Sequence, residues 1–390
     1  MTNRQIFLNH VAQTIDTPLG IEVVRAEGIY LYGPDGETYM DMISGISVSS
    51  LGHCHPAVVK AVQDQASKFM HLMVYGEYIY SPQVKLAEAL TNILPKSLDN
   101  FYFVNSGTEA TEGALKLAKR YTKRTEIISC HHAYHGSTAG SLSAMGSEDY
   151  KSAFRPLIPG HFHIQFNVEE DLDKITEKTA AVLIEVVQAE SGIIAGNEQF
   201  FHKLRQRCTE LGVLLIFDEI QTGIGRTGSM FAFEQIGVVP DILLLGKALG
   251  GGMPIAAFIA SKGVMQTLSH HPILGHISTF GGNAVTCAAA LAVVETLTHS
   301  TILSEVEFKG QLLESELRKL GFHHIRRKGL MLGIDLGDQE TNFAFIKKCV
   351  DNGIITDWFL FNMQTMRICP PLTITEAEIN LFISKLKILL

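Results

Sequence analysis

Short, continuously apolar runs alternate with segments of helical periodicity between residues 82 and 260. Segments with helical spacing of their apolar residues lie at 82–94, 108–121 and 198–211. The apolar runs have the length of buried strands: FYFV at 101–104, EIIS at 126–129, AAVLIEVV at 180–187, VLLIFD at 213–218, DILLLG at 241–246 and IAAFIA at 255–260. Strands that are apolar on both faces and separated by helices predict an α/β fold, with a mostly parallel sheet covered by helices on both faces.

The chain outside this region has a different pattern. After about residue 285, long helical patterns alternate with isolated strands, which is typical of a smaller α+β unit. A hairpin with a turn at Pro34-Asp35-Gly36 is expected near the N-terminus. The predicted domains are therefore an N-terminal segment, 1–50, packed with the small domain, a large domain, 51–284, and a small C-terminal domain, 285–390.

The charge balance, the apolar runs and the cysteine spacing limit which kinds of partner the protein can bind. Asp and Glu (40) exceed Lys and Arg (32), a formal net charge of −8, which argues against nucleic acid as a partner. Membrane-spanning apolar runs and the apolar core of a signal peptide are both absent from the sequence, so no membrane is expected and a cytoplasmic location is predicted. The six cysteines lack metal or redox spacing and are expected to be buried thiols.

Parallel sheets bind ligands beyond the carboxyl ends of their strands, and polar residues gather there. Asp218 ends one predicted strand, and Lys247 follows the next, before three glycines at 250–252. A lysine in this position suits phosphate binding or Schiff-base formation. The phosphate-binding P-loop is excluded, because it requires Gly where Asp241 stands and Ser or Thr where Ala248 stands.

Schiff-base chemistry with an aldehyde cofactor such as pyridoxal phosphate makes four demands. It needs a lysine, an acid for the pyridine nitrogen, an aromatic ring to stack on the cofactor and a site for its phosphate. Asp218 is the candidate acid, and Tyr134 lies beyond another predicted strand. The small-residue turn at 105–109 leads into a helix, whose free N–H groups and dipole favour a phosphate. Four strand ends thus supply four complementary parts.

The segments that carry these parts resemble the class III (subgroup II) pyridoxal-phosphate-dependent aminotransferases of fold type I. Within the family, the chain looks most like the acetylornithine, ornithine and 4-aminobutyrate aminotransferases. The resemblance rests on SGISVSSLGHCHPAVVKAV (44–62), NSGTEATEGALKLAKR (105–120), AYHGST (133–138), IEVVQAESG (184–192), the segment from Asp218 to Lys247, HISTFGGNAVTCAAAL (276–291) and MRICPPL (366–372). It implies a large domain with a mostly parallel seven-stranded sheet and a smaller α+β domain.

The resemblance also implies roles for the residues at the cofactor ring. Lys247 would form the Schiff base with the cofactor and, once released, carry a proton between the substrate and the cofactor. Asp218 would pair with the pyridinium nitrogen, and Gln221 would hydrogen-bond the phenolic oxygen. Tyr134 would stack on the ring, with His135 shaping the same loop.

Other implied contacts reach the phosphate. Ser106, Gly107 and Thr108 would form the turn that binds it. Thr279 would reach the phosphate of a neighbouring subunit, so the resemblance implies a homodimer with shared active sites.

The resemblance implies an arginine switch for two substrates. Arg367 would bind a substrate carboxylate, and Glu190 would neutralise Arg367 when the substrate has none there. Glu185 would line the same pocket. One departure concerns Ser137, which stands where the acetylornithine and ornithine branch usually has an arginine for the substrate α-carboxylate. The donor therefore binds its α-carboxylate elsewhere, or has none near the reacting nitrogen.

The expected function is transfer of an amino group from an ω-amino or (acetyl)ornithine-like donor to 2-oxoglutarate, by a ping-pong mechanism through aldimine and ketimine intermediates. Alternatives are a 4-aminobutyrate or other ω-amino acid transaminase, an aminomutase or decarboxylase on the same fold, and a cofactor-holding protein without activity. No metal is expected, because adjacent histidines point to opposite faces of a strand.

Overall fold

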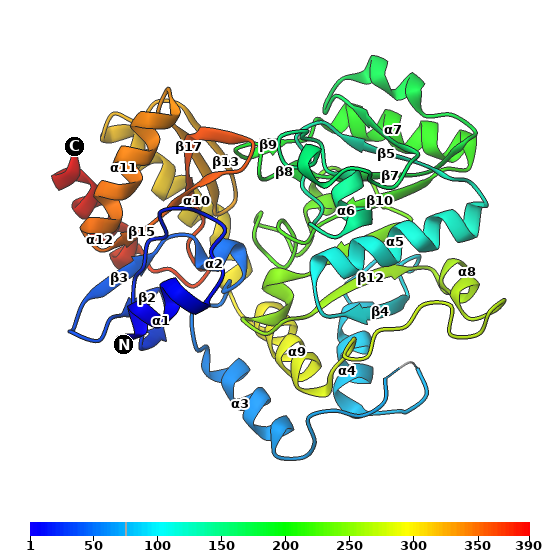
Figure 1. Ribbon diagram of the computed structural model, residues 1–390, viewed down its shortest axis with the longest axis horizontal. Helices are drawn as coiled ribbons and strands as arrows, with labels where there is room; N and C mark the ends of the chain where they lie inside the picture. The colour runs from blue at the N-terminus through cyan, green and yellow to red at the C-terminus, as the bar shows by residue number, and fades with distance from the viewer. Residues whose placement is uncertain (75) are drawn as a thin grey trace.

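The computed structural model describes residues 1–74 and 76–390, and a seven-stranded sheet lies at the centre of its larger part (Figure 1). The strand order is β4-β12-β11-β10-β7-β5-β6. β12 is antiparallel to both of its neighbours, and the other described pairs in this sheet are parallel. The predicted mostly parallel, seven-stranded sheet is confirmed. Its strands are β4 (Asn100–Val104), β5 (Glu126–Cys130), β6 (His161–Ile164), β7 (Thr179–Glu185), β10 (Leu214–Asp218), β11 (Ile242–Leu245) and β12 (Ala256–Ala260).

Side chains of each central strand alternate between two apolar clusters, one on each face of the sheet. In β10, Leu215 and Phe217 belong to the cluster that contains Phe200, Phe201 and Leu204 of α7 (Glu198–Leu211). Its other apolar residues, Leu214 and Ile216, belong to the cluster that contains Ala110, Ala114 and Leu117 of α5 (Gly107–Thr122). This two-sided burial explains why the strands read as continuous apolar runs.

Capping side chains and a left-handed glycine set the ends of the helices. The side chain of Ser106 accepts a hydrogen bond from Glu109 N–H at the start of α5, and Asn197 caps α7 in the same way. α7 ends at Gly212, which has a φ of 61°, a left-handed conformation that glycine adopts without a steric penalty. Two further helices on this part are α4 (Ser81–Thr91) and α6 (Ala139–Ala144).

Two strands differ from the sequence expectation. The run at 180–187 does not form one strand: β7 ends at Glu185, and β8 (Val187–Gln188) leaves the sheet to pair with β9 (Ile194–Ala195). β6 was not among the predicted runs. It is an edge strand with two histidines among its four residues, so the uninterrupted apolar pattern of its neighbours is missing.

The smaller part joins both ends of the chain. β3 (Thr38–Asp41) pairs with β2 (Tyr30–Tyr32) across the predicted turn, and it also pairs in parallel with β15 (Ile354–Ile355). β1 (Arg25–Glu27) completes this sheet. A second sheet consists of β13 (Ile325–Lys328), β14 (Met331–Asp335), β17 (Asn362–Ile368) and β16 (Asp357–Phe359), and α10 (Ile302–Lys319), α11 (Gln339–Asp351) and α12 (Glu376–Leu389) lie with it (Figure 1).

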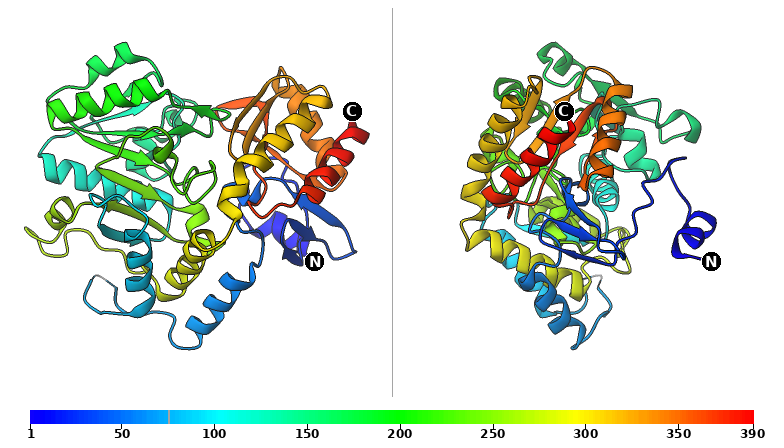
Figure 2. Two further views of the ribbon diagram at one scale, coloured as in Figure 1. Left: turned by 180° about the vertical axis from the view of Figure 1, so that it is seen from behind. Right: turned by 90° about the vertical axis from the view of Figure 1, so that its left-hand side faces the viewer.

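The remaining helices connect or flank these two parts. α9 (Ala284–Thr298) packs against α3 (Pro56–Ala66) and α4, although the predicted boundary assigns it to the small domain. The proposed division into three domains stays a prediction. α1 (Asn3–His10) has no buried residue and stands away from the body of the molecule (Figure 2). The short elements are α2 (Ser44–Ser47), α8 (Lys262–Met265) and the 3₁₀ turns η1 (Ser152–Phe154), η2 (Glu169–Lys174), η3 (Ala232–Gln235), η4 (Lys247–Gly250) and η5 (Gln266–Leu268).

Two expectations from composition can be compared with the described residues. No single helix among them has both the length and the apolar composition of a membrane span; α9 and α10 reach it only as a pair, across a bend of 73°. The prediction that the cysteines are buried is correct for five of the six and wrong for Cys54, which is exposed beside the α3 N-terminus.

Candidate active site

A cavity of about 290 Å³ lies at the carboxyl ends of the parallel strands, next to the N-terminus of α5. Its volume is at the lower limit of the range usual for small-molecule sites, roughly 300–1,000 Å³. The strand ends bring together residues that are far apart in sequence. The lining residues are Gly107, Thr108, Tyr134, His135, Gly136, Ser137, Glu185, Asp218, Ile220, Gln221, Thr222 and Lys247.

Lys247 enters the cavity directly after β11. It begins η4 with a φ of 43°, a left-handed conformation that a residue with a side chain rarely adopts. Such backbone strain, of order 1–3 kcal/mol, is characteristic of functional sites. Burial lowers the pKa of Lys247, although Glu190 and Asp218 oppose this shift. The shift enlarges the fraction of neutral, nucleophilic amine.

Asp218 is the last residue of β10 and is held by two donors. Its Oδ2 lies 2.7 Å from His135 Nδ1, and its Oδ1 accepts a hydrogen bond from Ile220 N–H at 3.0 Å. The side chain is buried, as is His135, whose Nε2 has no partner among the described residues. A carboxylate fixed in this way at a cavity wall can stabilise a positive charge on a ligand.

The α5 N-terminus faces the cavity through Gly107 and Thr108. The N–H groups of these residues have no intrahelical acceptor, because they belong to the first turn. A Cβ on Gly107 would lie 3.0 Å from Ile220 Cδ1, so the glycine allows the β10 loop to approach the helix end. Thr108 Oγ1 lies 2.7 Å from both Thr138 Oγ1 and Ser141 Oγ. Free N–H groups and hydroxyls at a helix N-terminus suit a phosphate.

Glu185 is the last residue of β7, and Tyr134 lies in the loop that follows the neighbouring strand β5. Burial, together with the charge of Asp218 opposite it in the sheet, raises the pKa of Glu185 well above its usual value. Glu185 also accepts long hydrogen bonds from the N–H groups of Tyr134 (3.4 Å) and Ala189 (3.3 Å). The hydroxyl of Tyr134 lies 3.3 Å from Ser137 Oγ.

Two neighbouring side chains hold unused polar atoms. Gln221 Nε2 and Thr222 Oγ1 are buried without a hydrogen-bond partner among the described residues. Such atoms are costly unless a ligand or water satisfies them. They lie on the same wall of the cavity as Asp218.

Arg367 and Glu190 form a buried, bidentate ion pair near this cavity. Arg367 Nη1 donates to Glu190 Oε1 at 2.9 Å, and Nη2 donates to Oε2 at 2.8 Å. Burial raises the pKa of Glu190, but Arg367 outweighs this effect, so the pKa is below its usual value. Both residues affect the pKa of Lys247, which places them close to it.

A second carboxylate also contacts Arg367. Asp357 Oδ1 lies 3.0 Å from Arg367 Nε, an ion pair whose angle falls short of a hydrogen bond. Burial raises the pKa of Asp357 to about 6, although Arg367 opposes this shift. Sequence analysis missed Asp357, because it lies ten residues before Arg367 and reaches it only by strand pairing of β16 with β17.

The cavity does not contain every predicted site residue. Ser106 caps α5 just outside the lining, and Thr279 is exposed on the segment before α9. Thr222, Thr138 and Ser141 were missed, although Thr222 directly follows Gln221 and could have been found by position. No group of three or more His, Cys, Asp or Glu side chains in residues 1–74 and 76–390 is arranged to hold a metal ion.

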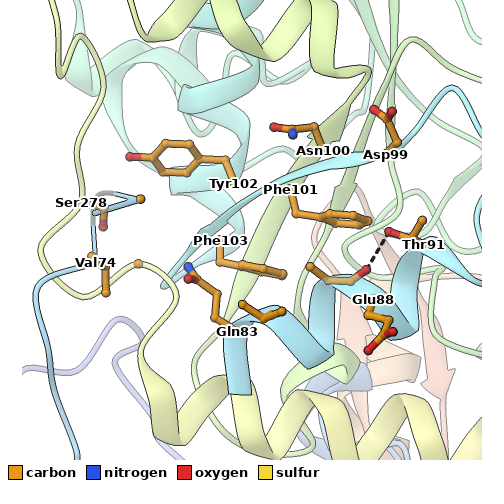
Figure 3. Close-up of a pocket in the computed structure, with 14 residues that line it drawn as sticks. Val74, Gln83, Glu88, Thr91, Asp99, Asn100, Phe101, Tyr102, Phe103 and Ser278 are labelled. Carbon is orange, nitrogen blue, oxygen red and sulfur yellow. Dashed lines mark hydrogen bonds between the residues drawn. The ribbon is translucent and has the colours of Figure 1, made fainter. Parts of the chain in front are cut away.

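A second cavity, of about 410 Å³, lies along the edge strand β4 (Figure 3). Phe101 and Phe103 point toward Gln83 and Glu88 of α4, whereas Tyr102 points to the other face of the strand. The described residues that line it include no lysine, arginine or histidine. This cavity therefore lacks the groups for Schiff-base chemistry, and the first cavity is the candidate active site.

Nearly the whole chain is similar to known proteins of one family. The family model "Aminotransferase class-III" matches residues 11–390. The acetylornithine aminotransferase of Methanocaldococcus jannaschii is 40% identical over 384 residues, covering 94% of this chain and 93% of the relative.

Solved structures share the fold. The ornithine aminotransferase of Toxoplasma gondii, whose active site holds pyridoxal phosphate at partial occupancy, superposes with a TM-score of 0.91 at 28% identity, over 98% of this chain and 92% of that one. The acetylornithine aminotransferase of Elizabethkingia anophelis superposes with a TM-score of 0.84 at 30% identity, over 98% and 96%. The chain belongs to the class III aminotransferases, which are pyridoxal-phosphate-dependent enzymes of fold type I.

Proposed function

We propose that this enzyme moves an amino group from an ω-amino or (acetyl)ornithine-like donor to 2-oxoglutarate, in two half-reactions of a ping-pong cycle. The observation that carries the proposal is the buried, bidentate pair of Arg367 with Glu190 beside Lys247. Such a pair presents a neutral wall to one substrate and a carboxylate-binding fork to another.

The residues of the cavity fit pyridoxal phosphate. The N–H groups of Gly107 and Thr108 and the Thr108 hydroxyl suit its phosphate, and Asp218 suits its pyridinium nitrogen. The orphaned Gln221 Nε2 suits its phenolic oxygen, and Tyr134 and Ile220, which line the same cavity, would flank its ring. When bound, the cofactor supplies an electron sink for the carbon that carries the amino group.

Lys247 has two tasks in this proposal. Its lowered pKa favours the neutral Nζ that a bond to the cofactor aldehyde would require. When not bonded to the cofactor, the same Nζ would act as the base that takes a proton from the substrate carbon and as the acid that returns it. His135 holds Asp218 in one orientation throughout, so the negative charge stays in place.

The donor site differs from the acceptor site in charge. Among the described residues that line the cavity, Lys247 is the only lysine or arginine, and Ser137 offers a hydroxyl where a cation would anchor an α-carboxylate. A donor that reacts at its ω-amine leaves Glu190 on Arg367. Glutamate and 2-oxoglutarate place a carboxylate on Arg367 and displace Glu190.

Half-reactions of the Glu190→Ala variant test this function. Stopped-flow absorbance follows conversion of the cofactor with ornithine, N-acetylornithine, 4-aminobutyrate or glutamate. Without Glu190, the buried Arg367 keeps Asp357 as its counter-charge but loses its bidentate partner. This destabilises complexes of donors that place no carboxylate on Arg367, because loss of one partner of a buried charged group costs about 1–3 kcal/mol or more. We expect at least a tenfold larger loss of kcat/KM for the best ω-amino donor than for glutamate.

The exposed Glu198 on α7 provides the matched control, since Glu198→Ala removes a carboxylate far from the cavity. This variant should leave the kcat/KM of both donors unchanged. Equal losses for both donor types in Glu190→Ala contradict the switch. A wild-type preference for short α-amino acids contradicts the ω-amino assignment.

A homodimer is part of the proposal. Thr279 is exposed, and the apolar side chains of Ile79, Ile273 and Phe280 are also exposed, at 94%, 78% and 57%. A surface of this kind favours contact with another chain. In a dimer, Thr279 of each subunit would contact the phosphate in the other.

A further inference from the structure

The side chain that neutralises Arg367 also holds the turn between β16 and β17. Glu190 Oε2 accepts a hydrogen bond from Leu360 N–H at 3.2 Å as well as from Arg367 Nη2. The Glu190 backbone carbonyl accepts from Phe361 N–H at 3.0 Å. Leu360 and Phe361 are the two residues of this turn, because Phe359 pairs with Asn362 across it. Removal of the Glu190 side chain from Arg367 therefore also frees one N–H group of the turn.

Tyr150 holds the same turn from the other side. Its hydroxyl donates a hydrogen bond to the Leu360 carbonyl at 3.1 Å. Its ring lies edge-on to Phe361, with centroids 5.6 Å apart and an interplanar angle of 77°. Tyr150 precedes η1, on the larger part of the molecule, whereas the turn belongs to the smaller part. Both backbone groups of Leu360 are thus used, one by Glu190 and the other by Tyr150.

We propose that Tyr150 is a positioning residue for substrate choice, which stabilises the state in which Glu190 covers Arg367. The inference rests on the proposed two-substrate function. A dicarboxylate that binds Arg367 displaces both oxygens of Glu190, and the Leu360 N–H loses its acceptor. The turn must then shift to find another partner, and the bond from Tyr150 to Leu360 opposes that shift. Tyr150 therefore favours ω-amino donors over dicarboxylates.

The Tyr150→Phe variant tests this role, because it removes one hydroxyl and keeps the ring. The probe is glutarate, which has the two carboxylates of 2-oxoglutarate but no oxo group to react. Calorimetry on the holoenzyme gives its Kd without turnover. We expect glutarate to bind Tyr150→Phe about 2- to 10-fold more tightly than wild type, the effect of one neutral hydrogen bond. The kcat/KM of the best ω-amino donor should fall by a similar factor.

The chain carries its own reporter for the turn. Trp358 is the only tryptophan, it lies two residues before Leu360, and its carbonyl accepts a hydrogen bond from Arg367 Nη2 at 2.9 Å. Saturating glutarate should change Trp358 emission, whereas an ω-amine that leaves Glu190 in place should not produce this change. The half-saturation point should shift in Tyr150→Phe as the calorimetric Kd does.

Two comparisons separate the positioning role of Tyr150 from a general structural effect. Tyr121→Phe removes a hydroxyl from the exposed end of α5 and should leave the glutarate Kd unchanged. In a Glu190→Ala background, Tyr150→Phe should change the Kd less than 1.5-fold, because the state that it stabilises no longer exists.

The inference is overturned if Tyr150→Phe leaves the glutarate Kd unchanged or weakens binding. It is also overturned if the variant tightens binding equally with and without Glu190, since Tyr150 then acts by another route. Failure of the proposed function has a different signature: Glu190→Ala itself alters neither glutarate binding nor the ratio of the two donor types.

Discussion

Two buried glutamates near Lys247 have pKa values shifted in opposite directions because their neighbours differ. Glu190 faces the Arg367 guanidinium, which outweighs burial and holds the pKa of Glu190 below its usual value. Glu185 has only two long N–H contacts and lies opposite Asp218, and its pKa is raised well above the usual value. Burial therefore favours the protonated form of Glu185, whereas Arg367 favours the ionised form of Glu190.

Replacement of Lys247 tests its role directly. Lys247→Ala removes both the bond-forming amine and the proton carrier, so turnover should fall by more than the roughly 10²–10⁴-fold that a single general acid–base group supplies. The folded protein should still bind the cofactor, without a covalent bond. Borohydride reduction and peptide mapping should label Lys247 in wild type. Lys60→Ala, on the exposed face of α3, is the control and should keep both label and activity. A label on another lysine contradicts the assignment.

The second counter-charge on Arg367 predicts a pH dependence. Burial raises the pKa of Asp357 to about 6, so Asp357 is neutral below pH 6 and ionised above it. The ionised form competes with a substrate carboxylate for Arg367. The Kd for glutarate should therefore decrease as the pH falls from 7.5 to 5.5, by a few-fold to about tenfold, the latter corresponding to about 1.4 kcal/mol.

The Asp357→Asn variant isolates this titration. It should bind glutarate at pH 7.5 as tightly as wild type does at pH 5.5. Any pH dependence that remains in the variant belongs to the ligand or to other groups. Identical pH profiles for wild type and Asp357→Asn, measured by calorimetry, would falsify this prediction.

At the scale of elements, the position of α5 decides the position of the phosphate site. The helix can lie close to the sheet because Gly113 faces β12, where a Cβ would lie only 2.3 Å from Phe258 Cε1. Ser106 at the N-cap then sets where the first free N–H groups appear. The close packing of α5 and its cap together bring Gly107 and Thr108 to the cavity.

Gly113→Ala should destabilise the protein despite the higher helix propensity of alanine. The added methyl group forces α5 or Phe258 to shift, and overpacking of this kind costs typically 1–3 kcal/mol. The matched control is Gly263→Ala in α8, where the nearest atom to a Cβ is Ser261 Oγ at 4.0 Å. Thermal unfolding should show a lower Tm for Gly113→Ala and an unchanged or higher Tm for Gly263→Ala. Equal Tm values for the two variants contradict the packing argument.

At the scale of the whole molecule, the two parts meet at the active site. The larger part supplies Lys247, Asp218 and Glu190, and the smaller part supplies Arg367 on β17. Arg226 links the two parts, because its buried guanidinium donates to the Pro370 carbonyl and, at 2.8 Å, to Ser50 Oγ. The distance between Arg367 and Lys247 thus depends on contacts between distant segments.

The proposed homodimer predicts a solution mass of twice the chain mass of 42.9 kDa, measurable by light scattering. Ile79→Asp places a charge on a side chain that is 94% exposed in the single chain. We expect it to weaken the dimer, and to lower cofactor affinity because Thr279 no longer reaches the neighbouring phosphate. Ile388→Asp, at a position 82% exposed on α12, is the control. A monomeric wild type with full activity contradicts the shared site.

The sequence by itself determined six of the seven strands of the central sheet, the family and the cavity residues that follow strands. Each of these depends on local order: a buried strand is an uninterrupted apolar run, and Lys247 or Asp218 is found at its end. Parallel strands bring their carboxyl ends to one edge, so the residues that follow them meet without further information.

Only the tertiary structure decided what surrounds Arg367 beyond Glu190, whose pairing with Arg367 the family resemblance already implied. Arg367 contacts Glu190, which is 177 residues away, and Asp357 on the neighbouring strand. Tyr150 donates a hydrogen bond to Leu360 across 210 residues. None of these contacts produces a periodic pattern in the sequence. The sequence also did not predict the edge strand β6 or the packing of α9 on α3 and α4, because both depend on contacts with distant segments. Which segment a half-exposed strand pairs with, or a long apolar helix packs against, depends on residues elsewhere in the chain. The local sequence pattern does not identify those residues.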